Sequence, residues 1–156
     1  LRLGEVLYRP DDAMAHVYFP EQCLLSVLTT DQDGETVETA MGGVEGALGL
    51  LEACGSGRSA ATSLVQVDGV AWRAPAAACR DLARSDPAFA ARAWTLVEQQ
   101  LTESRLSGMC QALHPVERRL ARWLLESMER SGGRNPMPLT QEFIASMLGV
   151  QRTTVN

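Results

Sequence analysis

The sequence contains no lysine, so all 14 of its basic residues are arginine. It also lacks any apolar run of about 18 residues, the length needed to cross a membrane, and no membrane-spanning segment is predicted. Aromatic residues make up only 5% of the chain, yet 46% of it is hydrophobic and 21% is charged. These proportions are typical of a globular protein. A chain of 156 residues can therefore bury a real core, as one ordinary domain or two small ones.

Motifs for metal binding and redox chemistry are missing as well. The four cysteines are Cys23, Cys54, Cys79 and Cys110. They are too widely spaced for a C-x-x-C pair, which argues against zinc, an iron–sulfur cluster or a redox dithiol. The two histidines, His16 and His114, lie far apart and have no ligand spacing. We expect the cysteines to be buried and reduced, the histidines to cap or pack, and no metal or catalytic residue to be present.

Charge is distributed unevenly along the chain. The formal net charge is -5 and the pI is near 5.0, which taken alone argues against a nucleic-acid-binding protein. However, residues 1–86 carry six arginines against thirteen acidic residues, whereas residues 87–156 carry eight arginines against six. The difference indicates two modules with different partners.

The first half of the sequence alternates short strand-like runs with turns. Strands are predicted over residues 5–9, 16–20, 23–30, 35–41, 61–67 and 70–75. Asp33-Gly34 and Asp68-Gly69 each lie between two such runs, as at the tip of a hairpin. The pattern predicts an antiparallel sandwich or barrel. The six glycines between residues 42 and 57 indicate tight turns or close approach of the backbone to a ligand.

The following sequence favours helices, over residues 76–85, 87–112 and 116–131. Asp86 and Pro87 suit the N-cap and first position of the long middle helix. Its apolar residues are Ala90, Trp94, Val97 and Leu101. Their spacing of four, three and four residues resembles a coiled-coil seam. We expect this helix to pack against its own β domain or against a second copy of the chain.

The C-terminal sequence carries the most specific motif. Thr140 suits a helix N-cap. Ala145, Gly149 and Val155 match the small, turn-forming and apolar positions of a helix-turn-helix. The motif predicts a DNA-binding unit, with a purely structural helical hairpin as the alternative.

The predicted DNA-contacting residues are Thr140, Gln141, Gln151, Arg152 and Thr153. Gln151 would begin the recognition helix, whose N-terminal side chains meet base edges in the major groove. Arg152 can donate two hydrogen bonds to guanine, and Thr153 can contact a thymine methyl group or a phosphate. Thr140 and Gln141 lie near the phosphate backbone in this arrangement. The alternative for Arg152 is a solvated surface charge.

Four motifs, at residues 17–20, 46–60, 114–122 and 140–155, together resemble the Crp/Fnr superfamily of bacterial transcription regulators. The resemblance covers essentially the whole chain and implies an α+β fold. It implies a jelly-roll-like, antiparallel β-roll of the cyclic-nucleotide-binding type over residues 1–86 and a dimerisation helix over 87–113. Residues 114–156 would form a helix-turn-helix domain with an incomplete winged helix. Both ends of the chain are expected to be truncated.

The resemblance also implies an effector site in the β-roll. Its candidate residues are Gly46, Ala47, Leu48, Gly49, Arg58, Ser59 and Ser104. Arg58 and Ser59 match the pair that holds the cyclic phosphate in nucleotide-binding members. Ala47 occupies the position of the ribose-binding glutamate, and its methyl group cannot accept a hydrogen bond. Three functions stay open for the Arg58–Ser59 pair: binding cyclic AMP or cyclic GMP, binding another small or anionic effector, or a structural role.

The resemblance therefore predicts an effector-responsive, sequence-specific DNA-binding regulator and not an enzyme. It implies a cytoplasmic homodimer that binds double-stranded operator DNA, contacts RNA polymerase and does not bind membranes. One alternative is a cyclic-nucleotide-sensing module that acts on a protein partner without binding DNA. A small β-barrel enzyme is another, but the barrel region has only His16 and lacks a metal-binding pattern.

Overall fold

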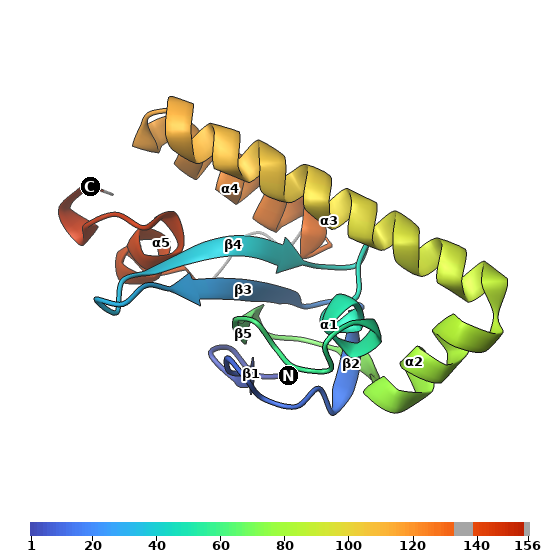
Figure 1. The fold of residues 1–156 in the computed structure, drawn as a ribbon. Helices are drawn as coiled ribbons and strands as arrows, with labels where there is room; N and C mark the ends of the chain where they lie inside the picture. The colour runs from blue at the N-terminus through green and yellow to red at the C-terminus, as the bar shows by residue number, and fades with distance from the viewer. Residues whose placement is uncertain (133–138, 155–156) are drawn as a thin grey trace.

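The computed structural model describes residues 1–132 and 139–154, which form two β-sheets and a set of helices (Figure 1). The strands are β1 (Val6–Tyr8), β2 (His16–Pro20), β3 (Leu24–Thr30), β4 (Thr36–Gly42), β5 (Thr62–Val67) and β6 (Ala71–Pro75). The helices are α1 (Leu50–Cys54), α2 (Ala76–Ser85), α3 (Pro87–Leu113), α4 (Val116–Arg130), α5 (Gln141–Leu148) and the short 3-10 helix η1 (Arg152–Thr154). The predicted α+β class is confirmed.

The strands are antiparallel and divide between two sheets, in the orders β1-β5-β3-β4 and β2-β6. The hairpin predicted at Asp33-Gly34 is confirmed, since β3 pairs with β4 and Gly34 has a φ of 86°. The hairpin predicted at Asp68-Gly69 is wrong, because β5 and β6 belong to different sheets. The chain there crosses between the sheets, and a Cβ on Gly69 would collide with the carbonyl of Gln22. The glycine is needed for this close approach.

Both faces of the larger sheet are covered. Leu25 and Val27 of β3 face the core inside the roll, whereas Leu24 and Leu28 face a second core shared with α4 and α5. Successive side chains of a strand point to opposite faces. A strand covered on both faces is therefore mostly apolar, as β3 is over residues 24–28 with the single exception of Ser26. The β-roll and the C-terminal helices share one of the two cores.

Helix α3 runs across the whole molecule, from α2 to a position above α4 (Figure 1). Its predicted start is confirmed: Asp86 Oδ1 accepts hydrogen bonds from the backbone N–H of Ala88 at 2.8 Å and of Phe89 at 3.2 Å. It ends at His114, whose extended backbone precedes Pro115. Cys110 is the only buried residue on this helix. Most of its surface is therefore partly or fully exposed.

The cysteines follow the prediction with one exception. Cys23, Cys79 and Cys110 are buried, but Cys54 at the end of α1 is exposed. Within residues 1–132 and 139–154, no group of three or more His, Cys, Asp or Glu side chains could hold a metal ion. None of the helices found in those ranges is both long enough and apolar enough to span a bilayer.

Candidate effector site and nucleic-acid interface

The loop before α1 contains four of the predicted effector residues, and backbone hydrogen bonds fix its shape. The main chains of Leu48 and Tyr18 exchange hydrogen bonds of 2.8 and 3.0 Å, which join the loop to β2. Gly46 N–H donates to the carbonyl of Gly43 at 3.1 Å. Gly49 has a φ of 84° and begins α1. Ala47 and Leu48 are buried, so the loop contributes to the core as well as to the roll's surface.

The side chains of Arg58 and Ser59 donate to main-chain carbonyls of the roll. Arg58 is exposed, and its Nη1 donates to the carbonyl of Asp11 at 2.7 Å. Ser59 is buried, and its hydroxyl donates to the carbonyl of Ala61 at 2.8 Å. A phosphate bound by this pair would have to replace both hydrogen bonds.

A small cavity lies between β4, the loop and α3. Gly46, Ala47 and Leu48 line it together with Gln100 and Glu103 of α3. Its volume is about 30 Å³, which is room for one water molecule. Gly49, Arg58, Ser59 and Ser104 are not among its lining residues. The structure thus brings three of the seven predicted effector residues against α3, in a space that a cyclic nucleotide would have to enlarge. Ala47 also lines a second, larger cavity.

A larger apolar cavity of about 260 Å³ lies between α1, α2 and α3. Leu50, Ala93, Trp94 and Val97 are among its lining residues. Arg80, also in its wall, donates from Nε to the carbonyl of Ala53 at 2.8 Å. The cavity borders Trp94, a predicted seam residue, whose side chain is exposed.

The geometry around α5 is that of the first half of a helix-turn-helix. Thr140 Oγ1 accepts a hydrogen bond from Phe143 N–H at 3.1 Å, which confirms it as the N-cap. Gly149 ends the helix with φ 61° and ψ 46°, and Val150 N–H donates to the carbonyl of Ala145 at 3.0 Å. Ala145, on α5, is buried. Val155 lies outside the described residues.

The predicted DNA-contacting side chains are all solvent-accessible. Thr140 and Gln141 are exposed at the start of α5, and residues 151–153 are exposed at and around η1. Arg152 Nη1 forms an ion pair of 3.0 Å with Glu142 Oε1 in the first turn of α5. This pair connects the two ends of the predicted interface.

Two family profiles match the chain. One is described as a cyclic nucleotide-binding domain and matches residues 1–86, and the other is a Crp-like helix-turn-helix domain that matches residues 118–156. The chain belongs to the Crp/Fnr family of transcription regulators. This family consists of regulators, not enzymes.

Solved structures of other Crp/Fnr regulators share the fold. FixK2 from Bradyrhizobium japonicum superposes with a TM-score of 0.83 at 19% identity, covering 99% of this chain and 77% of FixK2. A CRP-family regulator from Thermus thermophilus superposes with a TM-score of 0.81 at 18% identity, covering 99% of this chain and 78% of that regulator. The c-di-GMP responsive regulator CLP from Xanthomonas campestris superposes with a TM-score of 0.77 at 13% identity, covering 99% of this chain and 80% of CLP. A search of the curated proteins found no match.

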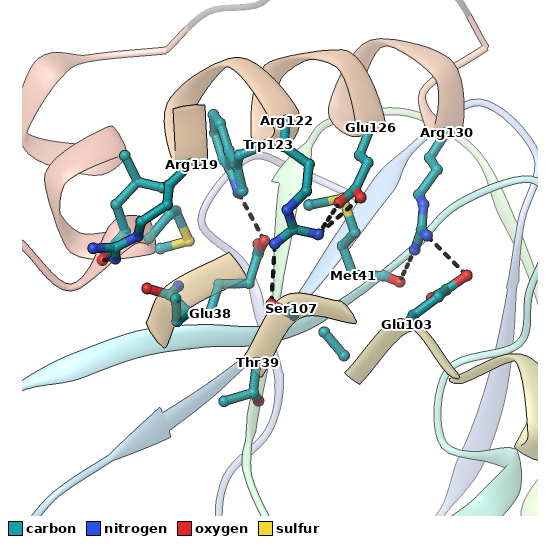
Figure 2. Close-up of a pocket in the computed structure, with 14 residues that line it drawn as sticks. Glu38, Thr39, Met41, Glu103, Ser107, Arg119, Arg122, Trp123, Glu126 and Arg130 are labelled. Atoms are coloured by element: carbon teal, nitrogen blue, oxygen red, sulfur yellow. Dashed lines mark hydrogen bonds and ion pairs between the residues drawn. The ribbon is translucent and has the colours of Figure 1, made fainter. Parts of the chain in front are cut away.

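Sequence reasoning missed a buried polar network between the β-roll of this Crp/Fnr chain and α4. Trp123 Nε1 on α4 donates to Glu38 Oε1 on β4 at 2.7 Å (Figure 2). Ser26 Oγ on β3 lies 2.6 Å from both Glu38 Oε2 and Gln66 Oε1. Gln66 Nε2 on β5 donates to Ser127 Oγ on α4 at 3.2 Å. Three neighbouring strands are thereby bonded to one helix.

Burial changes the acid–base chemistry of this network. Desolvation raises the pKa of Glu38 to about 7, and the negative charge of Glu126 acts in the same direction. Hydrogen bonds from Ser26 and Trp123, and the positive charge of Arg130, lower the pKa but do not cancel the effect of burial. Glu38 therefore titrates near neutral pH.

Three arginines of α4, Arg119, Arg122 and Arg130, line the same pocket as Glu38 and Trp123 (Figure 2). Arg119 donates from Nη2 to the carbonyl of Leu148 at the end of α5. Arg122 forms an ion pair of 2.8 Å with Glu126 and donates to Ser107 of α3 at 3.1 Å. In the described part of the chain, the Nε atoms of Arg119 and Arg122 have no hydrogen-bond partner. The same helix thus contacts α3 and α5 as well as the sheet.

The sequence did contain a signal for this contact. Gln66 interrupts the apolar run of β5, and Ser127 stands four residues after Trp123 in the apolar stripe of α4. A polar residue at a position that the pattern assigns to the core must find a hydrogen-bonding partner there. Identifying the partner required the fold, since Gln66 and Ser127 are 61 residues apart.

Proposed function

We propose that the chain is a homodimeric, sequence-specific DNA-binding regulator in which α3 carries the dimer interface. The exposed apolar surface of α3 supports this proposal. Trp94 is 72% exposed and Leu101 is 49% exposed, and both belong to the predicted seam. Leu106, Met109 and Leu113 add a second exposed apolar stripe at a spacing of three and four residues. An apolar surface of this extent on a soluble domain marks an interaction site.

A second copy related by a two-fold axis would cover this surface in both chains. Two α3 helices packed along Trp94 and Leu101 would interdigitate as in a coiled coil. The apolar cavity beside Trp94 lies on the same side and would be closed by the partner helix. The two helix-turn-helix units would then read a palindrome with half-sites about 34–36 Å apart.

DNA recognition is assigned to the predicted residues around α5 and η1. Gln151, Arg152 and Thr153 are exposed and follow the turn at Gly149, as required of the start of a recognition helix. Thr140 and Gln141 serve as phosphate contacts. Glu142 holds Arg152 in the free protein, and the exposed ion pair is weak enough for DNA to replace it.

The Arg58–Ser59 pair is assigned a structural role, in preference to binding cyclic AMP, cyclic GMP or another anion. Its hydrogen bonds to the carbonyls of Asp11 and Ala61 support this assignment. Ala47 also leaves a ribose hydroxyl without an acceptor. Signals from the β-roll reach the helix-turn-helix through α3 and through the core that the sheet shares with α4 and α5. Contact with RNA polymerase and a cytoplasmic location remain predictions.

A gel-shift assay with the full-length protein and the DNA upstream of its own gene tests this function. We expect a sequence-specific shift, and we expect Arg152→Ala to weaken binding by roughly 10- to 100-fold. Arg73→Ala is the matched control, because Arg73 is an exposed arginine on β6. A missing sequence-specific shift, or equal effects of the two variants, would contradict the proposal.

A further inference from the structure

The network between the sheet and α4 has a hydrogen-bond geometry that depends on one proton. The Ser26 hydroxyl has a single hydrogen, yet its oxygen lies 2.6 Å from two acceptor oxygens, Glu38 Oε2 and Gln66 Oε1. Two oxygens at this distance need a hydrogen between them. If Glu38 is a neutral carboxylic acid, Glu38 donates to Ser26 and Ser26 donates to Gln66. Every contact in the network then has a donor and an acceptor.

The ionised carboxylate cannot satisfy the same arrangement. Ser26 would have to donate to Glu38, and the contact between Ser26 and Gln66 Oε1 would lose its hydrogen. The Gln66 amide would need to rotate so that Nε2 faces Ser26 and Oε1 faces Ser127. Ionisation of Glu38 therefore reorganises the hydrogen bond that Gln66 makes to α4.

We propose that Glu38 is a proton-linked positioning residue, which in its neutral form holds α4, and with it the helix-turn-helix, against the sensor sheet. Loss of the proton leaves a buried charge at this contact, which favours separation of α4 from β3, β4 and β5. The geometry confines the effect to the interface between the two halves of the chain. Glu38 is only 7% exposed, and Trp123, its partner on α4, is 3% exposed.

Charged groups from the adjoining helices face the site but do not neutralise a buried carboxylate. Those on α4 are Arg119, Arg122, Glu126 and Arg130, and α3 contributes Glu103. Arg122 is paired with Glu126, and Arg130 with Glu103. The lining residues from α5, Met147 and Leu148, are uncharged, as are the network members Ser26 and Gln66. Arg122 and Arg130 are therefore each already paired with a carboxylate other than Glu38.

The direction of the pH effect follows from the raised pKa of Glu38, about 7 against an ordinary value of 4.5. Between these two values the docked state binds a proton that the separated state has lost. The docked state is therefore favoured at low pH and weakens as pH rises toward 7. Above about pH 7 the effect levels off.

Two measurements on the full chain test the proposal. The first is a carbon-13 NMR titration of the Glu38 carboxyl, assigned by comparison with Glu38→Gln. The second is hydrogen exchange of α4 amides between about pH 5.5 and 8.5, corrected for the intrinsic exchange rate. Glu38→Gln mimics the neutral acid, since its amide can donate to Ser26 and accept from Trp123. Glu35→Gln, in the exposed turn before β4, is the matched control.

We expect Glu38 to titrate within about one unit of pH 7, and α4 protection to fall by roughly 10- to 100-fold across this range. Protection of α4 should stay constant in Glu38→Gln and follow the wild type in Glu35→Gln. An ordinary carboxyl titration, near about pH 4 to 5, would overturn the proposal. Equal loss of protection in Glu38→Gln would overturn it as well. If Glu38→Gln does not fold, the carboxyl signal is assigned through its couplings to the Glu38 backbone, and the wild-type titration decides.

Discussion

Arg130, the last residue of α4, donates a hydrogen bond from Nη1 to the main-chain carbonyl of Met41 on β4 at 2.8 Å (Figure 2). Its Nη2 forms an ion pair of 2.8 Å with Glu103 of α3, and Nη1 lies 3.5 Å from Glu45 in the loop of the effector region. The side chain is only 14% exposed. One guanidinium therefore connects β4, the loop before α1 and the long helix α3 to α4, in the C-terminal half of the chain.

Removing this guanidinium should destabilise the protein. We expect Arg130→Ala to lower the free energy of unfolding by about 1–3 kcal/mol, because it leaves the Met41 carbonyl and the partly exposed Glu103 without their partner. Urea denaturation measures the effect. Arg118→Ala, at an exposed arginine of the same helix, should change stability by less than about 0.5 kcal/mol. Equal effects of the two substitutions would contradict the assigned role of Arg130.

Two adjacent glycines should respond very differently to alanine. A Cβ on Gly43 would collide with the backbone carbonyl of Arg130, whereas a Cβ on Gly42 meets no atom within 4 Å. We expect Gly43→Ala to cost about 1–3 kcal/mol through overpacking, and Gly42→Ala to be nearly neutral. Thermal unfolding of both variants checks this. Similar melting temperatures would show that α4 does not pack this closely on the loop.

The pKa of Glu38 also predicts how global stability depends on pH. Because the folded state holds the proton more tightly than the unfolded state, this group makes stability fall as pH rises from about 4.5 to 7. The loss should be about 3 kcal/mol at most. Glu38→Gln should remove this component and be more stable than the wild type at about pH 8. Glu35→Gln should retain the pH dependence of the wild type. Urea denaturation at several pH values measures the free energy of unfolding of all three proteins.

The proposed dimer interface can be tested on α3. Leu101→Glu places a charge on the exposed seam, where it would be buried by the partner, and should weaken dimerisation by roughly tenfold or more. Leu82→Glu is the control, since Leu82 is a similarly exposed leucine on α2. Sedimentation equilibrium measures the dimer dissociation constant of both variants. Unchanged association of Leu101→Glu would exclude this face of α3 from the interface.

Cyclic AMP should not bind to the Arg58 region. We expect no heat from calorimetric titration of the wild type or of Arg58→Ala with cyclic AMP, because Arg58 and Ser59 are bonded within the roll. Arg58→Ala should instead lower stability by about 0.5–1.5 kcal/mol through loss of the hydrogen bond to Asp11. If cyclic AMP binds to the wild type and not to Arg58→Ala, the prediction is wrong and Arg58 belongs to a nucleotide-binding site.

Local signals predicted most of the elements. Asp86 with Pro87 set the start of α3, Thr140 set the start of α5, and Gly149 set the turn, since caps and turns depend on a few neighbouring residues. Asp68-Gly69 was misassigned because the same dipeptide suits a hairpin and a crossing between sheets. Which strands pair is decided by packing over the whole domain, which one local motif does not encode.

The candidate sites were less predictable than the fold. The resemblance implies a phosphate site at Arg58 and Ser59, and this stays a prediction; in the structure their side chains donate hydrogen bonds to nearby carbonyls. Cys54 was expected to be buried by its residue type, and its place at the end of α1 exposes it. The contact of Glu38 with Trp123 joins residues 85 positions apart. Such pairs depend on tertiary arrangement and not on spacing.

The core shared by the sheet and the C-terminal helices also limits which segments of this regulator can be exchanged with those of another. Leu24, Leu28 and Met41 are buried by Trp123, Met147 and Leu148, so each half completes the other. A chimera that joins this β-roll to the DNA-binding segment of another regulator would leave an apolar sheet face open to water. Such hybrids should aggregate unless the outer face of the sheet is transplanted together with α4 and α5.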